Sequence, residues 1–440
     1  MMNCSVRRLA ARFGLKASAR SSLCVAPVGL EFQKTINYTL RLFSGNGEKV
    51  GAVEDRFAMS EEEKAAEFMQ FKADPTQFLN NMSASLREEA DQKYSHAEMH
   101  RERGEYDEAL ALFTEALELC KDLDGEESTN VATTYNNMAL IYDSQGHHTK
   151  ALELYEMSLE ISLANLGAEH PEVASTYNNM ALTYRNQGDY TKSLEYFEKC
   201  LEILLAKLGA DHPNVATTHN NMALIYNNQG DYTKALGLYE KCLETYLAKF
   251  GGDHPDVATT YNNMAGVLDN QGDYTKALKC YDKSLEIYLA KLGAEHPYVA
   301  SAYNNMALIY DSQGDHTKSL EYFEKCLEIK LAKLPADHPD VATTYNNMAL
   351  VYNNQGNRIE ALEYYEKCLE IKLAKLGADH PDVAITYNNM ALVIHDQGDY
   401  TKALEYFEKC LKIYLITLGA DHHYTKGTQG WIETVKDKIK

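Results

Sequence analysis

Histidine and cysteine recur at fixed intervals along this sequence, and both residue types bind metals or act in catalysis. A His-Pro pair occurs six times and a seventh copy has His-His: His170, His212, His254, His296, His338, His380 and His422. A metal ion needs ligands at about 2 Å, whereas packed helices of neighbouring repeats stand roughly 10 Å apart. The interval therefore predicts no metal array, and the histidines are expected to cap or turn the chain before proline.

The regularly spaced cysteines are expected to pack rather than react. Five of them share one position of the repeated pattern: Cys200, Cys242, Cys326, Cys368 and Cys410. Ser158 and Ser284 occupy the same place in other copies, which indicates a small buried position. Stacked copies stand too far apart for a disulfide, whose Cα atoms lie within about 7 Å of each other. The cysteines therefore predict a reducing compartment.

No sequence pattern of an enzyme is present. The chain has no phosphate-binding loop, no dinucleotide-binding glycine pattern, no nucleophile elbow and no pattern typical of strands. His96 and His100 stand one helical turn apart but do not form the H-E-x-x-H metal motif. Because they fall where later copies have Met138 and Tyr142, we expect them to pack in the core. The sequence predicts neither catalysis nor a cofactor.

These residues belong to copies of one unit. Asn-Asn-Met begins at seven places with a step of 42 residues: Asn136, Asn178, Asn220, Asn262, Asn304, Asn346 and Asn388. Within residues 213–250, apolar residues at spacings of three and four predict two helices, separated by Gln229-Gly230-Asp231. Neither helix can bury its apolar stripe alone, so the units are expected to stack into a solenoid.

Residues 177–201, Y-N-N-M-A-L-T-Y-R-N-Q-G-D-Y-T-K-S-L-E-Y-F-E-K-C-L, closely resemble the tetratricopeptide repeat. The alternating small and aromatic positions of that motif are matched by Ala181, Tyr184, Gly188, Ser193, Phe197 and Cys200. The 42-residue period and the L-G-A-D-H-P-D-V-A connector are similar to the kinesin light chain type. The resemblance implies an all-α, right-handed superhelical solenoid of antiparallel helix pairs. A kinesin light chain would also have a long coiled coil before the repeats, which residues 1–84 do not predict.

The resemblance also implies a binding surface. In this family the first helix of each pair lines a concave groove, and the second Asn of each pair matches a position that contacts bound peptide: Asn137, Asn179, Asn221, Asn263, Asn305, Asn347 and Asn389. An Asn side chain both donates and accepts hydrogen bonds, so it suits the backbone of an extended peptide. The alternative is that these residues hydrogen-bond neighbouring helices. Thr or Ser one turn earlier adds hydroxyl groups.

The charges of the groove indicate the kind of partner. Asp143, Asp269 and Asp311 lie late in the first helix, where Arg185 is the exceptional cation. We therefore expect a neutral or basic peptide or helix as partner, rather than an acidic tail. The net charge of −21 argues against nucleic acid, and no apolar stretch is long enough to insert into a membrane. The same acidic charges could also be only a solvated face.

The amino terminus differs from the rest of the chain. Residues 1–30 contain five basic residues and no acidic residue, and Arg8, Arg12, Lys16 and Arg20 lie four apart along one side of a helix. With Arg41-Leu-Phe-Ser44, this pattern predicts a mitochondrial matrix presequence in residues 1–43. A plastid transit peptide, a secretory signal and a basic tail of a cytoplasmic protein are the alternatives.

The expected organisation follows from these patterns. Residues 44–84 are a linker with short helices, including one that opens at Ser60 and stops at Asp74-Pro75. Residues 85–418 are eight repeats, the first opening with a capping box of Ser85 and Glu88, and residues 419–440 are a capping helix. The repeats are expected at about 90–123, 132–165, 174–207, 216–249, 258–291, 300–333, 342–375 and 384–417. The expected function is a non-catalytic scaffold for a protein partner. A cytoplasmic, kinesin light chain-like cargo adaptor and a regulatory subunit of an enzyme complex are the alternatives.

Overall fold

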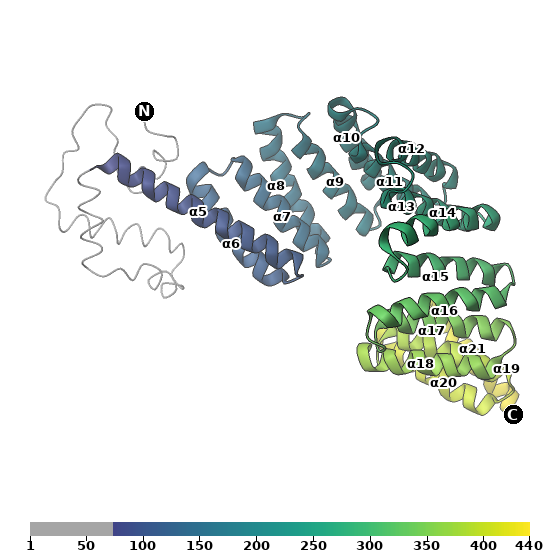
Figure 1. Cartoon of the computed structure of the whole chain (residues 1–440). Helices are drawn as coiled ribbons and strands as arrows, with labels where there is room; N and C mark the ends of the chain where they lie inside the picture. Colours follow the sequence, from purple (N-terminus) through teal and green to yellow (C-terminus); the bar gives the residue numbers. More distant parts are fainter. Residues whose placement is uncertain (1–73) are drawn as a thin grey trace, which may run out of the picture. The chain divides into compact units, whose positions relative to one another are not determined.

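The computed structural model describes residues 74–440, and this part of the chain is helical and contains no strand. Its 17 helices form eight pairs followed by one terminal helix (Figure 1). The chain divides into two units, Met1–Gly209 and Ala210–Lys440, which are described separately below as unit 1 and unit 2.

Each pair is one repeat, and we call its first helix A and its second helix B. The described part of unit 1 holds repeats 1 to 3: α5 (Pro75–Glu102), α6 (Tyr106–Asp124), α7 (Thr129–Ser144), α8 (His148–Leu166), α9 (Pro171–Asn186) and α10 (Tyr190–Leu208). Unit 2 holds repeats 4 to 8 and the terminal helix: α11 (Pro213–Asn228), α12 (Tyr232–Phe250), α13 (Pro255–Asn270), α14 (Tyr274–Leu292), α15 (Pro297–Ser312), α16 (His316–Lys333), α17 (Pro339–Asn354), α18 (Arg358–Leu376), α19 (Pro381–Asp396), α20 (Tyr400–Thr417) and α21 (His423–Ile439). Within each unit, helix B of one repeat packs against helix A of the next. The prediction of an all-α stack of helix pairs is confirmed.

The His-Pro pairs start the A helices. Pro171 is the first residue of α9, where its missing N–H has no partner to lose. His170 is the N-cap, and its Nδ1 accepts a hydrogen bond from the backbone N–H of Glu172 at 3.2 Å. The same bond recurs at each later copy, and His422 makes it to Tyr424 at the start of α21. The predicted capping role of these histidines is confirmed.

One short turn ends helix A and starts helix B. Gly188 has a φ of 82°, which costs a glycine little, and the next residue, Asp189, donates its N–H to the carbonyl of Tyr184 at 2.9 Å. The Asp189 carboxylate then accepts from the backbone N–H of Lys192 at 3.1 Å, which caps α10. A Gly-Asp pair therefore turns the chain and opens the following helix.

Small residues let the two helices of a repeat approach closely. In repeat 3, Ala181, Ser193, Phe197 and Cys200 are buried, and Ser193 Oγ donates to the Ala181 carbonyl oxygen at 2.6 Å. In repeat 4 the thiol of Cys242 donates to the carbonyl of Ala216 at 3.0 Å. The five cysteines at this repeat position are all buried, as the shared position with serine predicts.

The connectors that contain glycine also share one backbone conformation. Gly251 and Gly293 follow helices α12 and α14 with φ of 83° and 86°. Lysines near the ends of B helices pair with acidic residues of the preceding connector, as Lys333 does with Glu295 at 2.9 Å. Pro335 replaces the connector glycine after α16, and the N–H of His338 still bonds back to its carbonyl at 2.9 Å. A connector without the glycine can therefore keep the same backbone hydrogen bond.

Helix α5 begins at Pro75, ten residues before Ser85, where the sequence predicts the opening of repeat 1. Its first turn is capped by Asp74, which accepts from the N–H of Gln77 at 3.0 Å, and it runs through Ser85 without a break. The capping box expected at Ser85 is therefore wrong. His96 is exposed and His100 lies 2.5 Å from the Glu105 carboxylate, so the expectation that both pack in the core is also wrong.

Helix α21 covers the end of unit 2. Ile432 and Val435 are buried against repeat 8, and the ring of Trp431 stacks on Phe407 with 5.9 Å between centroids. Ile439, in contrast, is half-exposed. The capping helix predicted for residues 419–440 is therefore seen as α21.

Two further predictions lie outside the described residues: the presequence of residues 1–43 and the short helix opening at Ser60. Within residues 74–440, no helix combines the length and apolarity that crossing a bilayer requires.

Candidate functional site

The Asn positions singled out on the A helices, and the Thr or Ser one turn earlier, lie on one side of each helix, which we call the A face. In α15 the A face consists of Ser301, Asn305, Leu308 and Ser312, spaced three and four residues apart. Leu308 is 42% exposed although it belongs to a helix with a well-buried opposite side. Because helices α11, α13 and α15 adjoin within unit 2, their A faces lie next to one another.

The predicted asparagines occupy this face and are partly used by the fold. All seven are half-buried: Asn137, Asn179, Asn221, Asn263, Asn305, Asn347 and Asn389. Asn179 donates to Asn136 Oδ1 at 3.2 Å, and Asn263 donates to Asn220 Oδ1 at 3.0 Å. These bonds join the A helices of successive repeats, which is the structural role weighed above as the alternative. Peptide contact by the remaining donors and acceptors stays a prediction.

The hydroxyl groups one turn earlier bond mainly to their own helix. Thr259 Oγ1 donates to the carbonyl of Pro255 at 3.0 Å and lies 2.9 Å from the hydroxyl of Tyr288. Ser301 Oγ donates to the carbonyl of Pro297 at 3.1 Å. The hydroxyl hydrogens of Thr259 and Ser301 are therefore already donated within the helix. These two residues can offer a partner only the lone pairs of the hydroxyl oxygen.

Two of the three predicted acidic residues are hydrogen-bonded to neighbouring side chains. Asp143 lies 2.8 Å from His148 Nδ1 and accepts from Asn186 at 3.0 Å. Asp311 repeats this arrangement with His316 at 2.8 Å and with Asn354 at 3.1 Å. Each Asp is thus tied to the next helix B and to the next helix A, which limits what it can offer to a ligand.

Asp269 differs from these two carboxylates. The residue five positions later is Tyr274 rather than His, and the residue 43 positions later is Ser312 rather than Asn. Within the described residues Asp269 has neither the histidine nor the asparagine partner, and burial raises the pKa of its carboxyl. The sequence analysis singled out all three residues. The structure adds that their hydrogen-bond partners differ.

The described residues do not form a metal centre or a reactive thiol. No group of three His, Cys, Asp or Glu side chains in residues 74–440 is placed to hold an ion. The connector histidines use Nδ1 to accept a backbone N–H. Burial raises the pKa of the Cys242 thiol to about 12 and that of Cys410 to about 11, so both remain protonated thiols.

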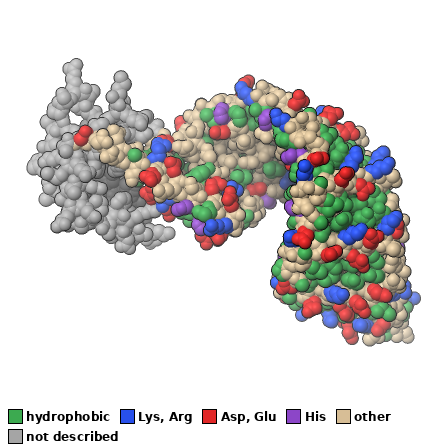
Figure 2. Space-filling view, in the orientation of Figure 1, with side chains coloured by type: hydrophobic (Ala, Val, Ile, Leu, Met, Phe, Trp, Pro, Cys, Tyr) green, Lys and Arg blue, Asp and Glu red, His purple; other side chains and the backbone are tan. Residues whose placement is uncertain are grey.

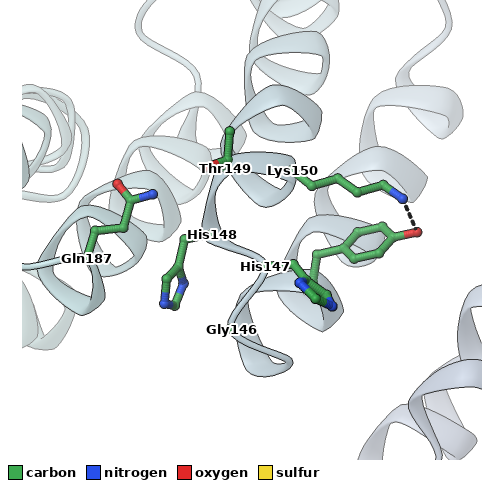
Figure 3. A pocket seen from close by; sticks show the side chains of 7 residues that line it. Gly146, His147, His148, Thr149, Lys150 and Gln187 are labelled. Atoms are coloured by element: carbon green, nitrogen blue, oxygen red, sulfur yellow. Dashed lines mark hydrogen bonds between the residues drawn. The ribbon is translucent and has the colours of Figure 1, made fainter. Parts of the chain in front are cut away.

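A shallow recess lies at the turn between α7 and α8, beside Gly146 (Figure 3). Lys150 Nζ donates to the hydroxyl of Tyr142 at 2.8 Å, and His148 is held by Asp143. In these two pairs the polar groups satisfy one another.

One regular feature escaped the sequence analysis. On four B helices a lysine lies over the ring of the tyrosine three residues before it, at 4.5 to 4.8 Å from the centroid: Lys199 over Tyr196, Lys325 over Tyr322, Lys367 over Tyr364 and Lys409 over Tyr406. The repeated Tyr-x-x-Lys spacing was the available signal, because residues three apart meet on a helix surface. These pairs strengthen the surface of helix B.

The surface of unit 2 mixes apolar and charged residues. On the face drawn in Figure 2, hydrophobic side chains gather over its helices, with acidic and basic side chains interspersed. A partner of this surface would therefore meet both apolar area and scattered charge.

Comparison with known proteins identifies the family. The tetratricopeptide repeat profile matches residues 90–164, 172–248, 215–270, 256–332, 340–416 and 382–426, which is most of the chain. The chain belongs to the tetratricopeptide repeat family, as the motif in residues 177–201 predicts. No curated protein matches it as a relative.

Three solved structures illustrate the likeness. A putative kinesin light chain of Podosopora anserina with nearly identical repeats has 22% identity and a TM-score of 0.43, covering 47% of this chain and 98% of its own. BtubC (BKLC) from P. vanneervenii has 21% identity and a TM-score of 0.45, covering 53% and 91%. The apo form of RapI has 17% identity and a TM-score of 0.48, covering 64% and 97%.

Proposed function

We propose that this protein is a non-catalytic scaffold that binds an extended segment or a helix of a protein partner along the A face. Membership in the tetratricopeptide repeat family supports a role in protein–protein interaction. The observation that carries the proposal is the A face itself. Half-exposed Asn side chains, hydroxyl oxygens and exposed leucines such as Leu308 and Leu350 repeat along it.

The chemistry of this row suits a peptide. Asn305 can present hydrogen-bonding atoms to a peptide backbone, while Leu308 one turn later offers apolar area to a side chain. Such Asn–Leu pairs recur once per repeat. They would therefore recognise the length and the backbone of a bound peptide more than the identity of any one of its residues. The partner is proposed to be neutral or basic, since Asp143, Asp269 and Asp311 lie late in helix A, where Arg185 is the exceptional cation.

Site-specific photo-crosslinking tests the proposal. A photoreactive amino acid at Ser301 on the A face should capture a partner from cells that express the protein. The same group at Lys279, an exposed residue of helix B in α14, is the control. Capture of one partner from Ser301 but not from Lys279 is the expected result. Equal capture from both positions, or capture from Lys279 alone, refutes binding along the A face.

A further inference from the structure

Repeat 5 departs from its neighbours at one point of the A face. Gly266 of α13 occupies the position where the other complete copies have leucine: Leu140, Leu182, Leu224, Leu308, Leu350 and Leu392. In the next two repeats that leucine is 42% and 38% exposed, and in repeat 4 Leu224 is half-buried, so the position lies at the edge of the exposed surface. A Cβ placed on Gly266 would meet only the hydroxyl of Tyr281, at 3.9 Å. There is therefore open space where a leucine side chain would otherwise stand.

A carboxylate without the partners of its equivalents, Asp269, lies one turn from this space. Asp269 follows Gly266 by three residues, which puts the two positions about 5–6 Å apart on one helix surface. Asp143 and Asp311 each have a histidine and an asparagine partner, and Asp269 has neither. Repeat 5 thus combines a missing apolar side chain with an uncompensated negative charge.

The residues around the space are held in place. Asn263 is fixed by its bond to Asn220, and Asn270 donates to Asn227 Oδ1 at 3.1 Å. On the side of repeat 6, Asn305 Oδ1 accepts a hydrogen bond from the side chain of Asn304 at 3.3 Å. Because these amides already bond within the fold, a ligand entering here does not have to order them first.

We propose that the space over Gly266 is a subsite for a Lys or Arg side chain of the bound partner segment. The methylene stem lies over the bare backbone of Gly266, and the cationic head pairs with Asp269. A cationic group would give the Asp269 carboxylate the ion-pair partner that it lacks. A long aliphatic stem would fill the volume that the leucines of other repeats occupy. This inference rests on the proposed function, since it specifies one partner residue at the A face.

The test is a selection from a displayed library of random twelve-residue peptides on the full chain. The selection is repeated on Asp269→Asn, which keeps the side-chain shape, and on Gly266→Leu, which restores the residue of the other repeats. Asp311→Asn is the matched control, because Asp311 is already paired. Circular dichroism of each variant checks that the helices are retained.

The wild-type chain and Asp311→Asn should enrich peptides with Lys or Arg at one recurring position. Both repeat 5 variants should lose that enrichment, and should bind the peptides selected by the wild type about tenfold more weakly. Enrichment without a cationic position, or an unchanged preference in both folded variants, overturns the subsite while leaving peptide binding intact. Failure to enrich any peptide overturns the subsite together with the proposed peptide scaffold.

Discussion

The bond between Asn263 and Asn220 allows a direct measurement of what the repeated asparagines do. Replacing Asn263 with Ala removes the amide that donates to Asn220 Oδ1 at 3.0 Å and leaves that half-buried oxygen without its donor. The net loss of one such bond is about 0.5–1.5 kcal/mol, rising toward about 3 kcal/mol if the oxygen stays dry. We therefore expect Asn263→Ala to lower the free energy of unfolding by about 1 kcal/mol.

A double-mutant cycle isolates the pair. If the two residues interact only through this bond, Asn220→Ala and Asn263→Ala together should be less destabilising than the sum of the single changes, by about 0.5–1.5 kcal/mol. Urea unfolding followed by circular dichroism gives the energies. Hydrogen exchange should rise mainly in α11 and α13, because a repeat contacts only its neighbours.

Asn389→Ala is the matched control, since it removes the same position from repeat 8. In the described chain no side-chain hydrogen bond joins Asn389 to α17, and the oxygen equivalent to the acceptor, Asn346 Oδ1, lacks a partner. The control should cost less stability than Asn263→Ala. Equal losses in the two variants, with zero coupling in the cycle, would refute the structural role of the bond. Loss of partner binding without loss of stability would instead support direct peptide contact by Asn263.

Three further predictions concern other parts of the chain. Cys326→Ala should melt higher than Cys326→Leu, because leucine overpacks a fully buried position by about 1–3 kcal/mol; equal melting temperatures would show that the position is not tightly packed. Burial and the nearby Lys241 lower the pKa of His219 in the folded protein. As pH falls below about 6.5, this histidine is therefore protonated first in the unfolded chain, and the folded state loses stability until the pH reaches the pKa of the folded state. His219→Tyr, which restores the residue of neighbouring repeats, should show a smaller fall in melting temperature between about pH 7 and pH 5, and identical falls would contradict this. Residues 1–43 are proposed to be removed on import, so mass spectrometry of the endogenous protein should find an amino terminus near Ser44, and intact Met1 or Met2 would refute the presequence.

The repeat architecture was predictable because local and long-range patterns agree. The Gly-Asp turn at Gly188 and the His-Pro cap at His170 each start or stop a helix by a local mechanism, and the 42-residue step repeats them. The start of α5 was not predicted. Ser85 and Glu88 form a valid capping pattern, but no Gly or Pro between residues 76 and 103 interrupts the helix that Asp74 and Pro75 begin.

The site was only partly predictable for a different reason. The A-face asparagines are visible in the sequence, but whether Asn263 meets Asn220 or a ligand depends on geometry between residues 43 positions apart. The exception at Asp269 was within reach of sequence reasoning, because its missing partners are at fixed offsets. Recognising it required knowing that those offsets bring Asp311 together with His316 and Asn354.

The repeated glycine connectors of unit 2 have a consequence for how the gene can change. Gly251 and Gly293 have similar backbone angles, and similar lysine–carboxylate bridges recur at successive connectors. Removing or inserting one 42-residue stretch between them rejoins equivalent ends, so each helix meets the kind of neighbour it met before. Recombination can therefore add or remove whole repeats without disturbing the packing of those that remain. The reach of the A face lengthens or shortens with it, while the cap supplied by α21 is kept.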